Sequence, residues 1–223
     1  MAKARQVAGG GRAVEVPPER LEGWYARFAS RNDGVRSTVS EPGSVVVTAG
    51  NGVSATATVP FGPLPVTGTF DGLAVDAFVS HVLVPRRIAL LLVRLGSHSL
   101  GIAFGGRVEL SRTDRHLVHG RSAAGGWSQQ RFARRRVGQA RQSLQAAAQD
   151  AFEVLVPRLS EVDAVVLGGD RRALDEVRED VRLAPLFARA ESRVLDIPEP
   201  RRSVLEDAAE RATAVEIVLR DAS

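Results

Sequence analysis

A long amphipathic pattern between residues 128 and 157 constrains the fold of this chain more than any other feature. Apolar side chains recur there every three or four residues, which places them in one stripe along a helix: Ala133, Val137, Ala140, Leu144, Ala147, Ala151 and Val154 or Leu155. Ser128 is a suitable N-cap for such a helix, and Pro157 ends it. The pattern therefore predicts one long helix that begins near Ser128.

Strand patterns dominate the chain before this helix. Two β-branched runs flank Asn51-Gly52, and two further runs flank Gly105-Gly106, so both glycine-containing pairs predict the turns of β-hairpins. Leu21, Trp24, Tyr25 and Phe28 recur at helical spacing. The expected elements are a helix at residues 17–31, a hairpin at 44–59, a helix at 70–84 and a β-meander at 87–113, which residues 115–120 extend or follow as a fourth strand.

Strands and helices alternate after the long helix. The expected order is a strand at residues 163–169, a helix at 171–180, a strand at 192–198, a helix at 202–212 and a strand at 214–220. Alternation of this kind indicates a mostly parallel sheet with right-handed crossovers. A meander followed by such units predicts a mixed sheet, as in ribonuclease-H-like domains. The expected fold class is α+β, with a flexible basic tail at 1–13, a small α+β module at 14–84 and the mixed-sheet domain at 85–223.

The composition and motifs exclude several kinds of site. The chain has no cysteine, which excludes a disulfide framework, a thiolate zinc finger and a cysteine nucleophile. His116 and His119 lack further ligands nearby, so no metal is expected, and no G-x-S-x-G elbow indicates a serine hydrolase. The stretch "LGGDRRAL" at residues 167–174 is neither G-x-G-x-x-G nor a P-loop, and predicts an ordinary strand-to-helix turn whose helix N-terminus can hold an anion. The absence of cysteine makes an intracellular protein the default expectation. No apolar run approaches ~20 residues, which predicts that nothing spans a membrane, and the N-terminus lacks the apolar stretch of a signal peptide.

Positive charge is concentrated around the start of the long helix. Between Asp114 and Asp150 lie seven arginines, two histidines and no carboxylate, whereas 17 acidic residues face 11 arginines from Asp150 onward. Arginines can contact the phosphates of a nucleic acid without reading its sequence, and a plain solvated helix face is the alternative. The candidates for RNA contact are Arg121, Arg131, Arg134, Arg135, Arg136 and Arg141, with Ser128 and with Trp127, which can stack on a base or anchor the loop.

Two glutamines follow a glycine pair at the start of the helix, in "AAGGWSQQRFARRR" at residues 123–136. A glutamine cannot serve as a general base at neutral pH, but it offers a carbonyl acceptor, amide donors and a backbone N–H. It can therefore position a water molecule and hold a developing oxyanion. Gly125 and Gly126 permit such a tip to enter a crowded site. The combination suits a catalyst that inserts into an active centre made largely by a partner.

The stretch "GRSAAGGWSQQRFARRR", with the meander before it and the strand–helix units after it, resembles the Vms-like release factors, especially their actinobacterial branch of peptidyl-tRNA hydrolases. These proteins are related to the class-one release factors of eukaryotes and archaea. The segment Gly126-Trp127-Ser128-Gln129 fits their G-x-x-Q motif, so the resemblance implies a catalytic role for Gln129, with Gln130 as the alternative. The zinc finger, ankyrin repeats and partner-binding helix of the eukaryotic members are not visible here.

The resemblance implies a cytoplasmic enzyme that hydrolyses peptidyl-tRNA and frees nascent chains from stalled large ribosomal subunits. Its partners would be the large subunit, its rRNA and peptidyl-tRNA, with no cofactor. Gln129 would place the water that attacks the ester carbonyl. Two alternatives stay open: an endonuclease that cuts the tRNA acceptor end with His116 or His119 as acid or base, and a noncatalytic factor that binds RNA or the ribosome.

Overall fold

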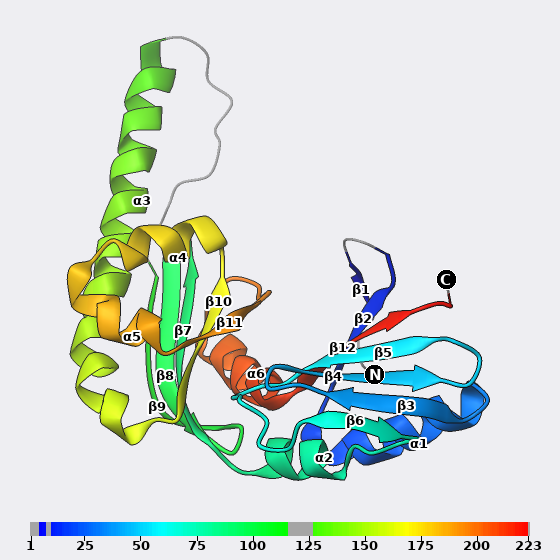
Figure 1. Cartoon of the computed structure of the whole chain (residues 1–223). Coiled ribbons are helices and arrows are strands. Elements are labelled where there is room, and N and C mark those ends of the chain that lie inside the picture. Colours follow the sequence, from blue (N-terminus) through cyan, green and yellow to red (C-terminus); the bar gives the residue numbers. More distant parts are fainter. Residues whose placement is uncertain (1–4, 8–9, 116–126, 223) are drawn as a thin grey trace. The chain divides into compact units, whose positions relative to one another are not determined.

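The computed structural model describes residues 5–7, 10–115 and 127–222, with residues 115 and 127–137 described by their backbone. The chain divides into two compact units. Unit 1 comprises residues 1–85 and 213–223, and unit 2 comprises residues 86–212. Each unit contains its own sheet (Figure 1).

Unit 1 is built on an antiparallel sheet of seven strands in the order β1-β2-β12-β5-β4-β3-β6. The strands are β1 (Arg5–Gln6), β2 (Arg12–Val16), β3 (Val35–Ser40), β4 (Ser44–Ala49), β5 (Ser54–Thr58), β6 (Gly68–Asp71) and β12 (Val215–Arg220). Buried and half-exposed side chains alternate along β4, so the sheet has one apolar face. Helices α1 (Leu21–Arg31) and α2 (Asp76–Leu83) cover that face: Tyr25 and Phe78 are buried in one cluster with Val45 and Ile217.

The expectations for unit 1 are confirmed for its hairpin and its first helix. Gly52 has a φ of 89° in the turn between β4 and β5, a conformation that favours glycine. The 3-10 turn η1 (Pro18–Arg20) leads into α1, as the helical spacing predicts. The helix expected at residues 70–84 is shorter than predicted, because residues 68–71 pair with β3 as strand β6 and the helix begins only at Asp76.

The basic N-terminal segment is not simply a tail, contrary to expectation. Residues 12–16 form β2, which pairs with β12, and residues 5–6 fold back on β2 as β1. The Arg5 guanidinium lies 2.5 Å from a carboxylate oxygen of Glu216 on β12. Backbone pairing with a distant strand therefore orders a segment whose composition alone indicates flexibility.

Unit 2 is built on a mixed sheet of five strands in the order β11-β10-β7-β8-β9. Strands β7 (Arg87–Arg94), β8 (Ser97–Phe104) and β9 (Arg107–Arg115) form the expected antiparallel meander, with Gly105 and Gly106 at positive φ in its second turn. Strand β10 (Ala164–Gly169) is parallel to β7, and β11 (Ala190–Leu195) is parallel to β10. The predicted α+β class and mixed sheet are thus confirmed.

Helices lie on both faces of this sheet (Figure 1). They are α3 (Trp127–Val154), α4 (Arg171–Arg178), α5 (Ala184–Ala188) and α6 (Arg202–Thr213), with the 3-10 turns η2 (Val156–Glu161) and η3 (Val181–Leu183). Side chains of α3, α4 and α5 share a core cluster with Leu91, Leu100 and Leu167 of the sheet. On the opposite face, a Cβ at Gly101 would lie 3.0 Å from Leu205 of α6. Residues 88–93 of β7 are therefore buried throughout, which explains their unbroken apolar run.

The last strand belongs to the other sheet, which corrects the expectation that it continues the strand–helix alternation. Strand β12 pairs antiparallel with β2 and β5 in unit 1. Its burial alternates: Val215 and Ile217 are buried, and Glu216 between them is half-exposed. This period of two is typical of an antiparallel strand with one solvated face, unlike the continuous apolar runs of β7 and β10. Among the described residues, no helix is long and apolar enough to cross a membrane.

Candidate functional site

The start of α3 carries the residues expected to act. Helix α3 begins at Trp127, within one residue of the predicted start, so Gln129 and Gln130 lie in its first turn. The preceding strand β9 ends at Arg115. The predicted residues Gly125, Gly126 and Arg121, together with His116 and His119, lie outside the described residues.

The C-terminal half of α3 packs against the sheet. Within residues 138–154, the part of the helix whose side chains are described, burial begins at Ser143 and Leu144 and continues through Ala147, Ala148 and Ala151. Gly138, Arg141 and Gln142 are exposed, and nothing lies within 4 Å of a Cβ built at Gly138. Figure 1 shows the N-terminal half of α3 standing clear of the rest of unit 2. The predicted apolar stripe is thus confirmed from Leu144 onward, while Ala140 is only half-buried and the side chains of Ala133 and Val137 lie outside the described ones.

Most arginines of α3 lie on its N-terminal half, which extends beyond the sheet (Figure 1). Arg131, Arg134, Arg135 and Arg136 belong to its first three turns, where the backbone alone is described. Arg141 is exposed and lines a groove of about 720 Å³ between α3 and the α4–η3 segment. The opposite wall of this groove carries Glu176, Glu179 and Asp180, together with Arg182, which pairs with Asp180. No sequence pattern indicates this groove, because it depends on two segments that meet only in the folded unit.

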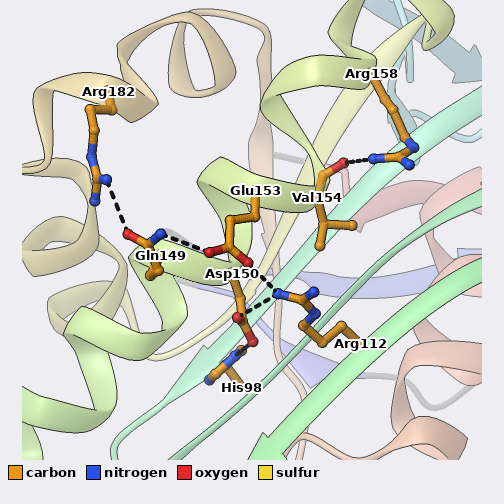
Figure 2. A network of polar contacts seen from close by, with 8 residues as sticks. All are labelled: His98, Arg112, Gln149, Asp150, Glu153, Val154, Arg158 and Arg182. Carbon is orange, nitrogen blue, oxygen red and sulfur yellow. Dashed lines mark hydrogen bonds and ion pairs between the residues drawn. The ribbon is translucent and has the colours of Figure 1, made fainter.

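A network of ion pairs ties the buried half of α3 to the sheet (Figure 2). One carboxylate oxygen of Asp150 accepts a hydrogen bond from His98 Nε2 of β8 at 2.9 Å, and the other accepts one from Arg112 Nη1 of β9 at 2.8 Å. The same Arg112 nitrogen lies 2.8 Å from Glu153, one turn further along α3. His98 is fully buried, whereas Arg112 is 44% exposed.

The network continues on the other side of α3. Gln149 donates a hydrogen bond to Glu153 at 2.8 Å and accepts one from Arg182 of η3 at 3.0 Å. Arg182 also pairs with Asp180 at 2.7 Å and lies over the ring of Phe152, 4.6 Å from its centroid. Helix α3 is therefore held from β9 on one side and from η3 on the other (Figure 2).

Hydrogen bonds shift the pKa values of several acidic and basic groups in this network. The hydrogen bond from Arg112, and after it the one from Gln149, lowers the pKa of Glu153 below its usual range. Hydrogen bonds to Glu153 and Asp150 raise the pKa of Arg112. Arg182 lowers the pKa of Asp180 in the same way. All these groups are thus held in their charged forms. The only sequence signal for the network is the return of acidic residues at Asp150 and Glu153, three apart on one helix face.

Other candidate sites have plain structural roles. The glycines of "LGGDRRAL" end β10, and the Asp170 side chain caps α4 by accepting a hydrogen bond from the Arg172 backbone N–H at 2.9 Å. The helix N-terminus is therefore occupied by a carboxylate of the chain itself, and the expected strand-to-helix turn is confirmed. Among the described residues, no group of three or more histidine, aspartate or glutamate side chains is placed to hold a metal ion.

Comparison with known proteins places unit 2 in a family. The model of the family described as Actinobacteria/chloroflexi VLRF1 release factor matches residues 86–218, more than half of the chain. A comparison with curated proteins finds no match. Among solved structures, the archaeal translation termination factor aRF1 matches with a TM-score of 0.44 and 14% identity, over 90% of this chain and 63% of that chain.

A second solved structure, described as an archaeal protein, matches with a TM-score of 0.39 and 17% identity, over 73% of this chain and 48% of that chain. The chain thus spans less than two thirds of the length of both structures. The family match includes the whole of α3 and the G-x-x-Q segment before and within its first turn. It confirms the resemblance drawn from the sequence: the chain belongs to the actinobacterial and chloroflexi VLRF1 release-factor family.

Proposed function

We propose that this protein hydrolyses peptidyl-tRNA and frees nascent chains from stalled large ribosomal subunits. The observation that carries the proposal is the family match over residues 86–218, which spans Gly126-Trp127-Ser128-Gln129 and the helix that begins there. We also propose that unit 2 is a ribonuclease-H-like domain. Its sheet order, with three antiparallel strands followed by two parallel ones, supports this assignment.

Gln129 is proposed as the residue that places the hydrolytic water. The first four backbone N–H groups of a helix lack partners within the helix, and Gln129 lies in the first turn of α3. Its backbone N–H and side-chain amide are therefore available to the attacking water and to the oxyanion that develops on the ester carbonyl. Gly125 and Gly126 would let this turn approach the ester closely, and Gln130 is the alternative catalytic residue.

The arginines of the protruding half of α3 are proposed to contact phosphates of rRNA or tRNA. Figure 1 shows the backbone of the N-terminal half of α3 standing clear of the rest of unit 2, and Arg131, Arg134 and Arg135 lie on this half. Arg141, whose side chain is described, is exposed. Arg121, Arg136, Ser128 and Trp127 complete the proposed contact set, with Trp127 stacking on a base. A ribosomal substrate of this kind would place the protein in the cytoplasm.

The test uses large ribosomal subunits that carry peptidyl-tRNA with a labelled peptide and a labelled tRNA. The proposal predicts that the purified protein releases the peptide and leaves the tRNA with a complete 3′ end. A tRNA shortened at its acceptor end would replace hydrolysis with an endonuclease reaction. Binding without release of either product would make the protein a noncatalytic ribosome-binding factor.

A further inference from the structure

Alanines form the middle of the face that α3 packs against the core of unit 2. The buried face of the helix presents alanines at positions 147, 148 and 151, between Leu144 on one side and Val154 with the partly buried Phe152 on the other. Large side chains interlock as ridges in grooves and thereby fix the angle between packed elements. Alanines form a smoother surface, on which a helix can roll or slide with less loss of contact.

Polar contacts can fix the direction of α3 more closely than contacts of alanine side chains do. Asp150 contacts two neighbouring strands at once, His98 on β8 at 2.9 Å and Arg112 on β9 at 2.8 Å. Arg112 also holds Glu153 at 2.8 Å, so it grips α3 at two points one turn apart. These contacts have defined directions and distances, and a rotation of the helix would break them.

We propose that Asp150, Arg112, His98 and Glu153 form a clamp that sets the direction of α3 and thereby positions Gln129. Asp150 and Arg112 are positioning residues, since they touch α3 and the sheet rather than the reacting ester. This inference rests on the proposed function for the role of Gln129, but the clamp itself concerns only the geometry of unit 2.

The length of the helix makes the clamp consequential. Gln129 lies about 30 Å along α3 from Asp150, at about 1.5 Å per residue. If the helix axis tilted by about 5° at the clamp, the start of the helix would therefore move by about 3 Å. A misplacement of about 1 Å can cost as much as ~100-fold in the rate of a reaction that depends on positioning.

The buried histidine reinforces this geometry. His98 donates to Asp150 from Nε2, and its Nδ1 is buried without a hydrogen-bond partner among the described residues. Because the ring is fully buried, it cannot follow Asp150 if the helix rolls. It therefore acts as a fixed point on the sheet side.

The test measures the direction of α3 directly. The chain has no cysteine, so spin labels can be placed at Gly138→Cys on α3 and Asp175→Cys on α4, both exposed in the structure, without a background signal. The distribution of distances between them is recorded in the full chain for Arg112→Gln, Arg112→Lys and Arg87→Gln. Arg87 is the matched control. Like Arg112, it is a half-exposed arginine that pairs with a glutamate, Glu109, at 2.6 Å, but this ion pair joins two strands of the sheet and does not involve α3.

We expect a narrow distribution in the doubly labelled parent protein and in Arg87→Gln, and a shifted or broader one in Arg112→Gln. Arg112→Lys should restore much of the parent distribution, because one nitrogen of Arg112 makes both carboxylate contacts and an ammonium group can replace it. In unlabelled protein, Arg112→Gln should lower kcat for peptide release ~10-fold or more, with KM and ribosome affinity little changed. Melting curves are recorded to check that each variant is folded.

Arg112→Gln with the parent distribution would overturn the clamp. A changed distribution with an unchanged kcat would overturn its role in positioning Gln129. If the parent protein itself releases no peptide, the proposed function fails, while the distance distributions still decide whether the clamp directs α3.

Discussion

Two glycines of unit 2 show how differently the same residue type can be constrained. Gly169, at the end of β10, has a φ of 108°, and a Cβ there would lie 2.0 Å from the Val93 carbonyl oxygen. Gly138, in the protruding half of α3, has no atom within 4 Å of a Cβ. Close approach of β7 requires the first glycine, whereas no packing contact requires the second.

Substitution with alanine should therefore have opposite effects at these two positions. Gly169→Ala should lower the free energy of unfolding of unit 2 by about 2 kcal/mol or more, because both the backbone conformation and the contact with Val93 become unfavourable. Gly138→Ala should raise it by up to about 1 kcal/mol, because alanine favours the helix. Denaturant unfolding of both variants is the measurement. A Gly169→Ala protein as stable as the parent would show that β7 and β10 do not approach as described.

Sequence patterns predict local conformation at the residue scale better than they predict partners. Asn51-Gly52 and Gly105-Gly106 predict their turns, because the ability of glycine to adopt a positive φ belongs to the residue itself and needs no distant partner. The role of His98 could not be predicted, since its partner Asp150 lies 52 residues away and the pair forms only when α3 packs on β8. The same holds for Arg112 and Glu153, which are 41 residues apart.

At the scale of elements, helix α3 joins two functions in one continuous segment. Its C-terminal half belongs to the core of unit 2, and its N-terminal half carries the arginines and the glutamines. The apolar periodicity predicted the whole helix, but it could not show which residues the core buries, because the half-buried Ala140 continues the same pattern as the buried Leu144. The sheet to which β12 belongs was harder still to predict from the sequence. Its pairing with β2 and β5 depends on strands in the N-terminal part of the chain.

The ion pairs at the base of α3 should make the effect of Arg112→Gln depend on pH. The pKa of Glu153 is lowered in the folded protein by Arg112 and Gln149, so its stabilising contribution is present above its unfolded pKa and is lost as the pH falls through its folded pKa. Arg112→Gln should therefore lower the melting temperature at pH 7, and the difference from the parent should shrink below about pH 4. Glu153→Gln should behave in the same way. A difference that stays constant from pH 7 to pH 3 would contradict the ion-pair account.

The arginines of the protruding half should contribute to ribosome affinity through charge. Arg134→Ala with Arg135→Ala should weaken binding, with the larger loss at low salt, and for a duplex-like partner the log–log salt slope should shrink by ~0.9 for each phosphate contact removed. Arg201→Ala with Arg202→Ala is the matched control, since both are exposed and already paired with Glu199 and Glu206. Equal affinity and slope in the two double variants would make the α3 arginines a solvated face.

At the scale of the whole molecule, the chain crosses from unit 1 to unit 2 and back again. Strand β12 lies between β2 and β5 in the sheet of unit 1, so the two ends of the sequence meet in one core. The segment expected as a single C-terminal domain at 85–223 therefore supplies a central strand to the sheet that the first 85 residues build. Neither half of the sequence completes unit 1 alone.

Removal of β12 should consequently unfold unit 1 while leaving the core of unit 2 intact. A chain that ends at residue 213 loses the buried Val215 and Ile217 and exposes the edges of β2 and β5. Limited proteolysis should then cleave rapidly within residues 12–85 and slowly within residues 86–113 and 140–212. A chain that ends at residue 220 keeps β12 and serves as the control. Protection of residues 12–85 in the shorter chain would contradict the described sheet order.

The central claim is that Gln129 enables hydrolysis of the peptidyl-tRNA ester, and the most direct measurement is the rate of peptide release by Gln129→Ala on peptidyl-tRNA bound to large subunits. Positioning and oxyanion contacts of this kind contribute ~10²–10³ in rate, so release should slow by that factor while folding and ribosome binding stay near those of the parent. Gln130→Ala should have a smaller effect, and the tRNA should keep its complete 3′ end in every reaction. Release by Gln129→Ala at the parent rate would contradict the assignment of catalysis to this residue.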